Sequence, residues 1–194
     1  RATGDAEWEV IFRRSLAAMA GGGTYDAVEG GLFRYSTTRD WSIPHFEKML
    51  QDNALLLYVC GLGYAVAPED WLMNVAERTY DYCKSVLYMD VPGAFAGSQD
   101  ADEAYYRLQT REMRAAARAP STDRRVYSDW NSLMANALLT CGLTMHRDAW
   151  VQQGLSLLRT VHDLCFDAVN GMAHIWHGKP DVWGLAHDAI AYGS

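Results

Sequence analysis

Hydrophobic residues recur along most of the chain at the three- and four-residue steps of an amphipathic helix. In three segments they fall on one side only, which predicts helices with one buried face at about 5–19, 69–89 and 147–166. Leu50–Val66 and Leu133–Met145 are apolar nearly all round, which predicts helices buried on every side, and a third helix of this kind is expected to begin near Trp183. The two kinds alternate, as outer and inner helices would.

A short repeat follows each one-sided helix. An aromatic residue and a Val-x-Gly turn recur in the segments that begin at Tyr25, Tyr88 and Phe166, which read YDAVEGGLF, YMDVPGAF and FDAVNGMA. The inner helices also share a motif, because NALL at 53–56 returns at 136–139. Internal repeats of this kind indicate the fold more reliably than the hydrophobic pattern of a single segment does. They predict three units, each made of an outer helix, a glycine-containing loop and an inner helix.

The repeated unit predicts an all-α fold. Stacked helical hairpins form either an open solenoid or a closed ring. The long segments at 20–43, 90–127 and 167–182 all connect an outer to an inner helix, so they lie at one end of the structure. This favours an (α/α)6 toroid, of which three hairpins are half. We therefore expect residues 1–194 to form one partial toroid domain, with both chain ends cut from a longer protein.

Composition excludes several classes of partner. The 194 residues carry a net charge of −7 without a long basic cluster, so no nucleic-acid partner is expected. No apolar run approaches the roughly 20 residues that cross a bilayer, so no membrane partner is expected. The four cysteines are far apart and lie in apolar helical patterns, which predicts buried free thiols and a cytoplasmic location.

The first loop carries candidate acid–base groups. His45, Lys48 and Asp52 are spaced to share one face of a helix, and Glu47 lies beside that face. A histidine near carboxylates at the mouth of a pocket suits general acid–base chemistry. The alternative is a surface cluster of salt bridges with a histidine in the first helical turn.

The second loop contains the acidic run SQDADE. Asp100 and Asp102 alternate, so both side chains would point the same way on an extended strand. With Glu103 they are expected to bind a cation, pair with Arg34, or act as acid and base. An acidic solvated loop is the alternative.

The third and fourth clusters begin inner helices. Trp130 and Asn131 are expected to face the open end of the ring, the alternative being a helix cap with a core tryptophan. His187 and Asp188 occupy the inner-helix place that Asp52 and Asn53 hold in the first unit. Because the spacing of the nearby histidines lacks a third placed ligand, no metal is predicted, and no cofactor either.

Together these side chains describe a pocket for an uncharged polyol. Aromatic faces pack on the CH faces of pyranose rings, and carboxylates and amides bind hydroxyls. The chain has no P-loop, no dinucleotide-binding glycine motif and no nucleophile elbow.

The segment Gly22–Ala54, with its PHFEKML core, resembles the YyaL-type family of thioredoxin-domain-containing proteins that includes the spermatid-specific thioredoxin-like proteins. SQDAD at 98–102 and DWNSLM at 129–134 are similar to further family stretches, with Ser132 in place of glycine. The chain departs from the family at Phe33, where a histidine is usual, and in the shorter stretch between Asp102 and Trp130. The resemblance implies a six-hairpin, glycosidase-like toroid that follows a thioredoxin-like domain absent from this chain. That toroid is similar in fold to N-acylglucosamine 2-epimerases.

These observations predict the toroid domain of a thioredoxin-domain-containing protein with a site for a small, sugar-like ligand. If the domain is catalytic, we expect sugar epimerase, isomerase or glycosidase-like chemistry. The alternatives are a non-catalytic module that binds a ligand or partner, and a helical-repeat scaffold for protein binding. The predicted catalytic residues are His45, Glu47, Asp52, Asp100 and Asp102. The predicted substrate-binding residues are Arg34, Tyr35, Trp41, Glu103, Trp130, Asn131, His187 and Asp188.

Overall fold

Outer and inner helices alternate in the structure as the hydrophobic pattern predicts. The structure is a computed structural model that describes residues 6–193. Residue 5, with which the first predicted helix begins, lies outside the described residues. The outer helices are α1 (Ala6–Gly21), α3 (Asp70–Tyr82), which continues into the π-helical turn Cys83–Leu87, and α7 (Asp148–Cys165). The inner helices are α2 (Leu50–Val66), α6 (Ser128–Thr144) and α8 (Ala186–Gly193).

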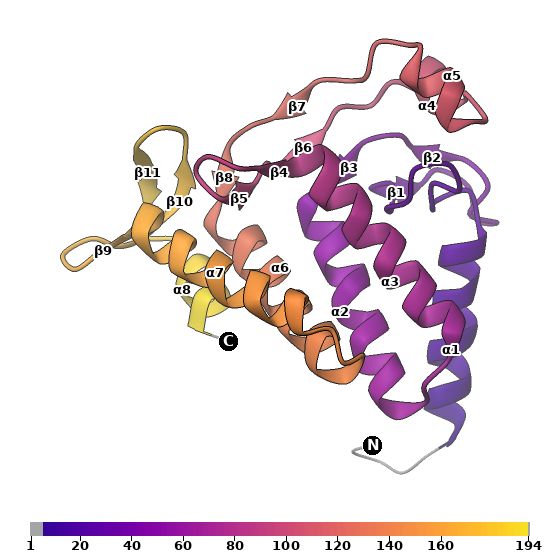
Figure 1. Ribbon diagram of the computed structural model, residues 1–194, viewed down its shortest axis with the longest axis horizontal. Coiled ribbons are helices and arrows are strands. Elements are labelled where there is room, and N and C mark those ends of the chain that lie inside the picture. Colours follow the sequence, from indigo (N-terminus) through magenta and orange to yellow (C-terminus); the bar gives the residue numbers. More distant parts are fainter. Residues whose placement is uncertain (1–5, 194) are drawn as a thin grey trace.

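The inner helices α2 and α6 pack on each other, and each carries its outer helix, α3 on α2 and α7 on α6 (Figure 1). Side chains such as Leu57, Leu138 and Leu157 are fully removed from water at these contacts. Each burial of this kind stabilises the fold by roughly 1.5–3 kcal/mol. At Gly61 an added Cβ would lie 3.0 Å from the sulfur of Cys141, so a glycine there lets α2 and α6 approach closely. The four cysteines are buried and free, as predicted.

The third inner helix differs from its prediction. Trp183 ends a strand, and α8 begins three residues later at Ala186. Although α8 packs on α6, it is mostly exposed, and Ile190 points to solvent. On α2, Leu55 and Leu62 are likewise exposed. No described element covers these faces, so the expectation of burial on every side holds for only part of each inner helix.

The Val-x-Gly repeat forms three hairpin turns, which confirms the predicted units. Tyr25 bridges Leu32, β4 (Tyr88–Met89) pairs with β5 (Ala94–Phe95), and β9 (Phe166–Asp167) pairs with β10 (Gly171–Trp176). The glycine of each repeat has a positive φ, of 87°, 90° and 82° in chain order. Glycine adopts this left-handed conformation without the steric penalty of other residues, so the turn explains the repeated position.

The inner helices repeat in a different register from the one that NALL suggests. The counterpart of Asn53 is Asn131, since each is the fourth residue of its helix and each amide holds the preceding hairpin. The Asn53 side chain accepts from the N–H of Leu32 and donates to its carbonyl, and Asn131 does the same with Phe95. Asn136 makes neither contact. Matching NALL at 53–56 with 136–139 was therefore wrong, because both copies contain a common apolar run.

Short strands and helices replace the predicted loops and gather at one end of the molecule, the upper side of Figure 1. Strand β3 pairs with β6 and β6 with β7, while β10 lies between β8 and β11. This end comprises β1 (Tyr35–Ser36), β2 (Pro44–His45), β3 (Lys48–Met49), β6 (Ser98–Gln99), α4 (Glu103–Tyr106), α5 (Arg111–Ala115), β7 (Thr122–Asp123), β8 (Val126–Tyr127) and β11 (Pro180–Trp183). We call it the loop end. Among residues 6–193, no helix combines the length and hydropathy that a bilayer span requires.

Candidate functional site

Part of the first predicted cluster comes together at the loop end. Strands β1 and β2 pair antiparallel with Tyr35 opposite His45, and their rings stack with centroids 5.0 Å apart. Beside them the guanidinium of Arg34 donates to the Glu47 carboxylate at 2.9 Å. Arg34, Tyr35, His45 and Glu47 are therefore neighbours, and a β-ribbon brings them together. Arg34 pairs with Glu47 and not with the acidic run at 100–103, which the sequence offered as its partner.

The predicted helical face of His45, Lys48 and Asp52 does not exist. His45 lies in β2 and Lys48 in β3, and the helix begins only at Leu50. Lys48 points into the core, where its ammonium donates to Asp26 at 2.7 Å and to the Gly30 carbonyl at 2.8 Å. The prediction failed because Pro44 and the pairing of β3 with β6 keep this segment extended.

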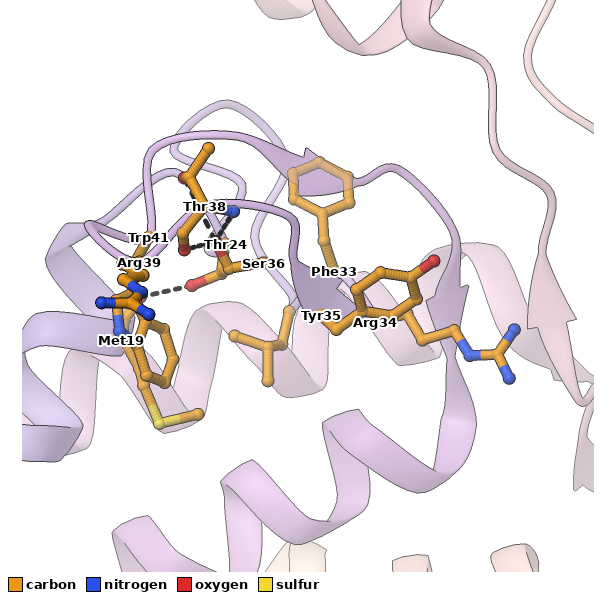
Figure 2. Close-up of a pocket in the computed structure, with 10 residues that line it drawn as sticks. Met19, Thr24, Phe33, Arg34, Tyr35, Ser36, Thr38, Arg39 and Trp41 are labelled. Atoms are coloured by element: carbon orange, nitrogen blue, oxygen red, sulfur yellow. Dashed lines mark hydrogen bonds between the residues drawn. The ribbon is translucent and has the colours of Figure 1, made fainter.

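A pocket of about 410 Å³ lies between α1 and the β1–β2 loop, and Arg34, Tyr35 and Trp41 contribute to its lining. Figure 2 shows Met19, Arg39 and Trp41 close together on one side, with the guanidinium of Arg34 turned away from them. The loop is held by its own side chains, among them the Ser36 hydroxyl, which donates to the Thr38 carbonyl at 2.7 Å.

Asp52, in the first turn of α2, has an unusual carboxyl group. One oxygen, Oδ2, is buried and has no hydrogen-bond partner among the described residues. Burial raises the pKa of Asp52 to about 6, the nearby Arg34 opposes that rise and Glu47 adds to it. Asp52 is therefore a carboxyl group that carries its proton well above the usual pH range.

His45 lacks the carboxylate partner that the sequence suggested. Its Nδ1 is buried without a hydrogen bond, and within residues 6–193 no ion pair joins its ring to an acid. Its observed contact is the ring of Tyr35. A histidine base is usually oriented by a hydrogen bond to its second nitrogen, so this geometry favours a binding role over an acid–base role for His45.

The acidic run of the second loop is not a strand with two parallel carboxylates. Strand β6 ends at Gln99, and Asp100 accepts a hydrogen bond from the Ser121 hydroxyl. Asp102 caps α4 by accepting from the N–H of Tyr105 at 2.9 Å, and Glu103 pairs with Arg107 on the surface. The two carboxylates therefore do not share one face of an extended strand, because Asp102 serves as the N-cap of α4, a position that Asp favours.

Sequence reasoning missed a buried ionic network below the first loop. Asp26 pairs with Lys48 and also with Arg114, whose guanidinium reaches Glu29 at 2.8 Å. Burial acts to raise the pKa of Asp26, but Lys48 and Arg114 outweigh it and the pKa is lowered. Burial lowers the pKa of Lys48 to about 8. The network ties the hairpin at Tyr25 to α5, and its partners are 22 and 88 residues apart, so no local pattern indicates it.

The start of α6 meets α8 and β10 in a second polar cluster. His174 Nδ1 lies 2.8 Å from Asp188 Oδ1, and His187 Nε2 lies 3.4 Å from both Asp188 Oδ1 and Asp129 Oδ2. Burial raises the pKa of Asp129. We call Asp129, His174, His187 and Asp188 the His–Asp cluster. The sequence named two of them as substrate-binding residues but gave no contact between them.

Aromatic rings flank the His–Asp cluster. Trp130 packs on Tyr127 with centroids 4.4 Å apart, and Tyr127 meets the ring of His174 at 5.5 Å. Asn131, in contrast, is fully buried and uses its amide on the backbone of Phe95 and Tyr127. Its expected position facing the open end is wrong, since the repeated hairpin takes up its hydrogen-bonding groups.

Comparison with known proteins gives sequence relatives over about half of the chain. No protein-family model matches it. Spermatogenesis-associated protein 20 of Mus musculus is 40% identical over 88 residues, which are 45% of this chain and 11% of that protein. The Homo sapiens protein is 37% identical over 96 residues, 49% of this chain and 12% of its own length. The chain thus spans only about an eighth of these relatives.

Solved structures give the fold. A D-mannose isomerase superposes with a TM-score of 0.71 at 10% identity, over 93% of this chain and 41% of its own. A family 76 glycoside hydrolase (mannosidase) of Bacteroides thetaiotaomicron superposes with a TM-score of 0.67 at 11% identity, over 84% of this chain and 40% of its own. A cellobiose 2-epimerase of Spirochaeta thermophila superposes with a TM-score of 0.65 at 16% identity, over 90% of this chain and 42% of its own. At these identities the likeness shows the fold alone, that of the α/α toroid. The chain is therefore related in sequence to the thioredoxin-domain family of spermatogenesis-associated protein 20 and has the helical fold of six-hairpin, glycosidase-like toroids.

Proposed function

We propose that the loop end binds a carbohydrate-type ligand and that Asp52 supplies to it a carboxyl group of raised pKa that exchanges a proton. One observation carries this proposal: each of two adjacent inner helices has a carboxyl group in its first turn and an aromatic pair close to that group in sequence. Tyr35 and His45 precede Asp52 at α2, and Tyr127 and Trp130 flank Asp129 at α6. Aromatic faces cover the apolar faces of a sugar ring, and carboxyl groups bind its hydroxyls.

The fold neighbours support the same ligand class. The three toroids named above are a D-mannose isomerase, a mannosidase and a cellobiose 2-epimerase. Fold likeness alone does not fix an activity, because one fold hosts many reactions. The side chains on this chain, rather than the neighbours, therefore specify the class of ligand.

Asp52 suits proton donation at neutral pH. A general acid works best when its pKa lies near the working pH, and burial brings the pKa of Asp52 to about 6. The reaction classes that need such a group on a sugar are hydrolysis of a glycosidic bond, where it protonates the leaving oxygen, and epimerisation or isomerisation, where it returns a proton to carbon or oxygen. We propose this class of chemistry for the complete site.

Replacing Asp52 by asparagine is expected to stabilise the fold at pH 7 by about 1–2 kcal/mol, a value reduced for partial exposure. The pKa of Asp52 rises from 3.8 to about 6 on folding, so the folded protein holds the proton more tightly than the unfolded chain. Ionisation of Asp52 therefore destabilises the fold progressively between about pH 4 and pH 6 and fully above that range. Urea unfolding of both proteins at pH 4 and pH 7 measures the effect. An equal difference at both pH values would contradict it.

The second candidate is a non-catalytic module that binds a ligand or a thioredoxin-like partner domain. The unpartnered His45 favours it, because no aligned histidine–carboxylate pair lies in the first loop. The thioredoxin-like partner is inferred from the family of the relatives alone. This candidate retains the aromatic pairs and predicts binding without turnover.

A thermal-shift screen of monosaccharides, disaccharides and sugar phosphates on the full chain tests the proposal. We expect at least one neutral sugar to raise the melting temperature in a concentration-dependent manner. The shift should shrink in Asp52→Asn and persist in Trp8→Ala, a matched aromatic control, since Trp8 is exposed on α1. A shift equal in both variants would remove Asp52 from the site, and no shift with any sugar would overturn the ligand class.

A further inference from the structure

The His–Asp cluster is assembled from three elements that are distant in sequence. Asp129 is the second residue of α6, His174 lies within β10, and His187 and Asp188 lie in the first turn of α8. Pairing of β10 with β8, where Ile175 lies opposite Tyr127, brings His174 to the start of α6. Packing of α8 on α6 and β10 adds the other two side chains. The fold itself, not one flexible loop, fixes their spacing.

The four side chains offer a compact set of metal-ligating atoms. One nitrogen or oxygen from each residue lies within 4.8 Å of all the others. The nitrogen–oxygen separations are 2.8, 3.4, 3.4 and 3.8 Å. Ligand bonds of about 2.0–2.2 Å at tetrahedral angles place neighbouring ligand atoms about 3.3–3.5 Å apart. The shortest separation, from His174 to Asp188, is a hydrogen bond, and the two separations of 3.4 Å from His187 match the edges of a coordination tetrahedron. The separation of 3.8 Å, from His174 to Asp129 Oδ1, is longer than such an edge.

A second, independent observation concerns the carboxylate of Asp188. The Asp188 side chain is fully buried, and its Oδ2 has no hydrogen-bond partner within the described part of the chain. A buried carboxylate oxygen without a partner is costly, because it has lost water without replacement. No lysine or arginine forms an ion pair with Asp129 or Asp188 among residues 6–193, so histidines are the nearest counter-charges. With neutral imidazoles the cluster carries two negative charges.

We propose that Asp129, His174, His187 and Asp188 bind one divalent transition-metal ion of the zinc type. Two imidazole nitrogens and two carboxylate oxygens suit zinc and its neighbours, whereas calcium and magnesium prefer oxygen alone. The ion balances both carboxylates and gives Asp188 a partner. The side chain of His187 is 56% exposed, so the site is accessible to an ion from solvent. The metal site shares Asp129 with the proposed sugar site, but metal binding requires neither Asp52 nor a bound sugar.

Metal titration of the full chain tests the proposal. After dialysis against a chelator, calorimetric titration with Zn²⁺ is expected to show one ion per chain, and Co²⁺ is expected to give the visible absorption of a tetrahedral nitrogen–oxygen site. His187→Ala should weaken Zn²⁺ binding by about 100-fold or more, since it removes a ligand rather than an outer contact. Because His187 is largely exposed, this variant retains the fold, which circular dichroism of the metal-free protein verifies.

The matched control is His177→Ala. His177 lies just after β10 and is partly exposed, and among residues 6–193 its ring forms an ion pair with the nearby Asp181 alone, at 3.4 Å. The His177→Ala variant should bind Zn²⁺ with an affinity within about 2-fold of that of the wild type. Asp188→Asn, which keeps the volume of the buried side chain, should abolish the Co²⁺ spectrum. A wild-type chain that binds no Zn²⁺, or binding that His187→Ala leaves unchanged, would overturn the proposal.

Discussion

Replacing Asp26 by alanine is expected to lower the free energy of unfolding by about 3–5 kcal/mol. Asp26 is the shared partner of two buried cations, Lys48 at 2.7 Å and Arg114 at 2.5 Å. Removing it leaves the Lys48 ammonium with one carbonyl acceptor and aromatic rings, including Tyr82 at 4.0 Å. A buried charge that loses its counter-ion costs more than the pair contributed, because the desolvation has already occurred. Urea unfolding monitored by tryptophan fluorescence measures the loss.

Glu103→Ala is the matched control for Asp26. Glu103 also pairs with an arginine, Arg107, but both side chains are exposed, so the expected change is below about 1 kcal/mol. The pKa of Asp26 is lowered in the folded state, so its contribution is present above the ordinary carboxyl pKa and is lost as the pH falls through the folded value. If Asp26→Ala were no more destabilising than Glu103→Ala, the network would not be a stabilising link between the first hairpin and α5.

Asn131→Ala is expected to destabilise the fold by about 2–4 kcal/mol. The amide makes three hydrogen bonds in the core, with the N–H and carbonyl of Phe95 and the carbonyl of Tyr127. Alanine leaves these buried backbone groups without partners, and each unsatisfied group costs about 1–3 kcal/mol, partly relieved by relaxation. Thermal and urea unfolding at neutral pH measure the change.

Asn136 gives the control on the same helix. Asn136 is partly exposed, and the hydrogen bond that its side chain accepts from Thr140 is long, at 3.4 Å. Asn136→Ala should therefore change stability by less than about 0.5 kcal/mol. Similar losses for Asn131→Ala and Asn136→Ala would contradict the register in which Asn131, and not Asn136, is the counterpart of Asn53.

The helices and hairpins were predictable because their causes are local. Apolar spacing gave α2 its observed bounds, and the Val-x-Gly repeat marked turns whose glycines are left-handed. The apolar pattern alone begins α6 only at Leu133, because the first turn of the helix is polar: Asn131 and Ser132 are buried there through hydrogen bonds, which a hydrophobic pattern does not register. A pattern of apolar positions therefore locates helices better than it locates their ends.

The candidate site was only partly predictable because its contacts are not local. Arg34, Tyr35 and Trp41 lie on one short ribbon, so sequence proximity was enough to group them. Lys48 was expected on a surface, yet a partner 22 residues away draws it into the core. His174 joins Asp129 only through the pairing of β10 with β8, which no spacing within either segment indicates. Proximity in sequence therefore groups the residues of the first ribbon, whereas the contacts of Lys48 and His174 depend on the fold.

The central claim is that a carbohydrate-type ligand binds beside the inner-helix starts of the loop end. Calorimetric titration of the full chain with the sugar that gives the largest thermal shift tests it most directly, in the wild type, Trp130→Ala and Trp8→Ala. We predict saturable binding in the wild type and Trp8→Ala, and at least a 10-fold weaker affinity in Trp130→Ala, since stacking on an aromatic ring is worth about 1.4 kcal/mol or more. Equal affinities in all three proteins, or no binding by a folded wild type, would contradict the claim.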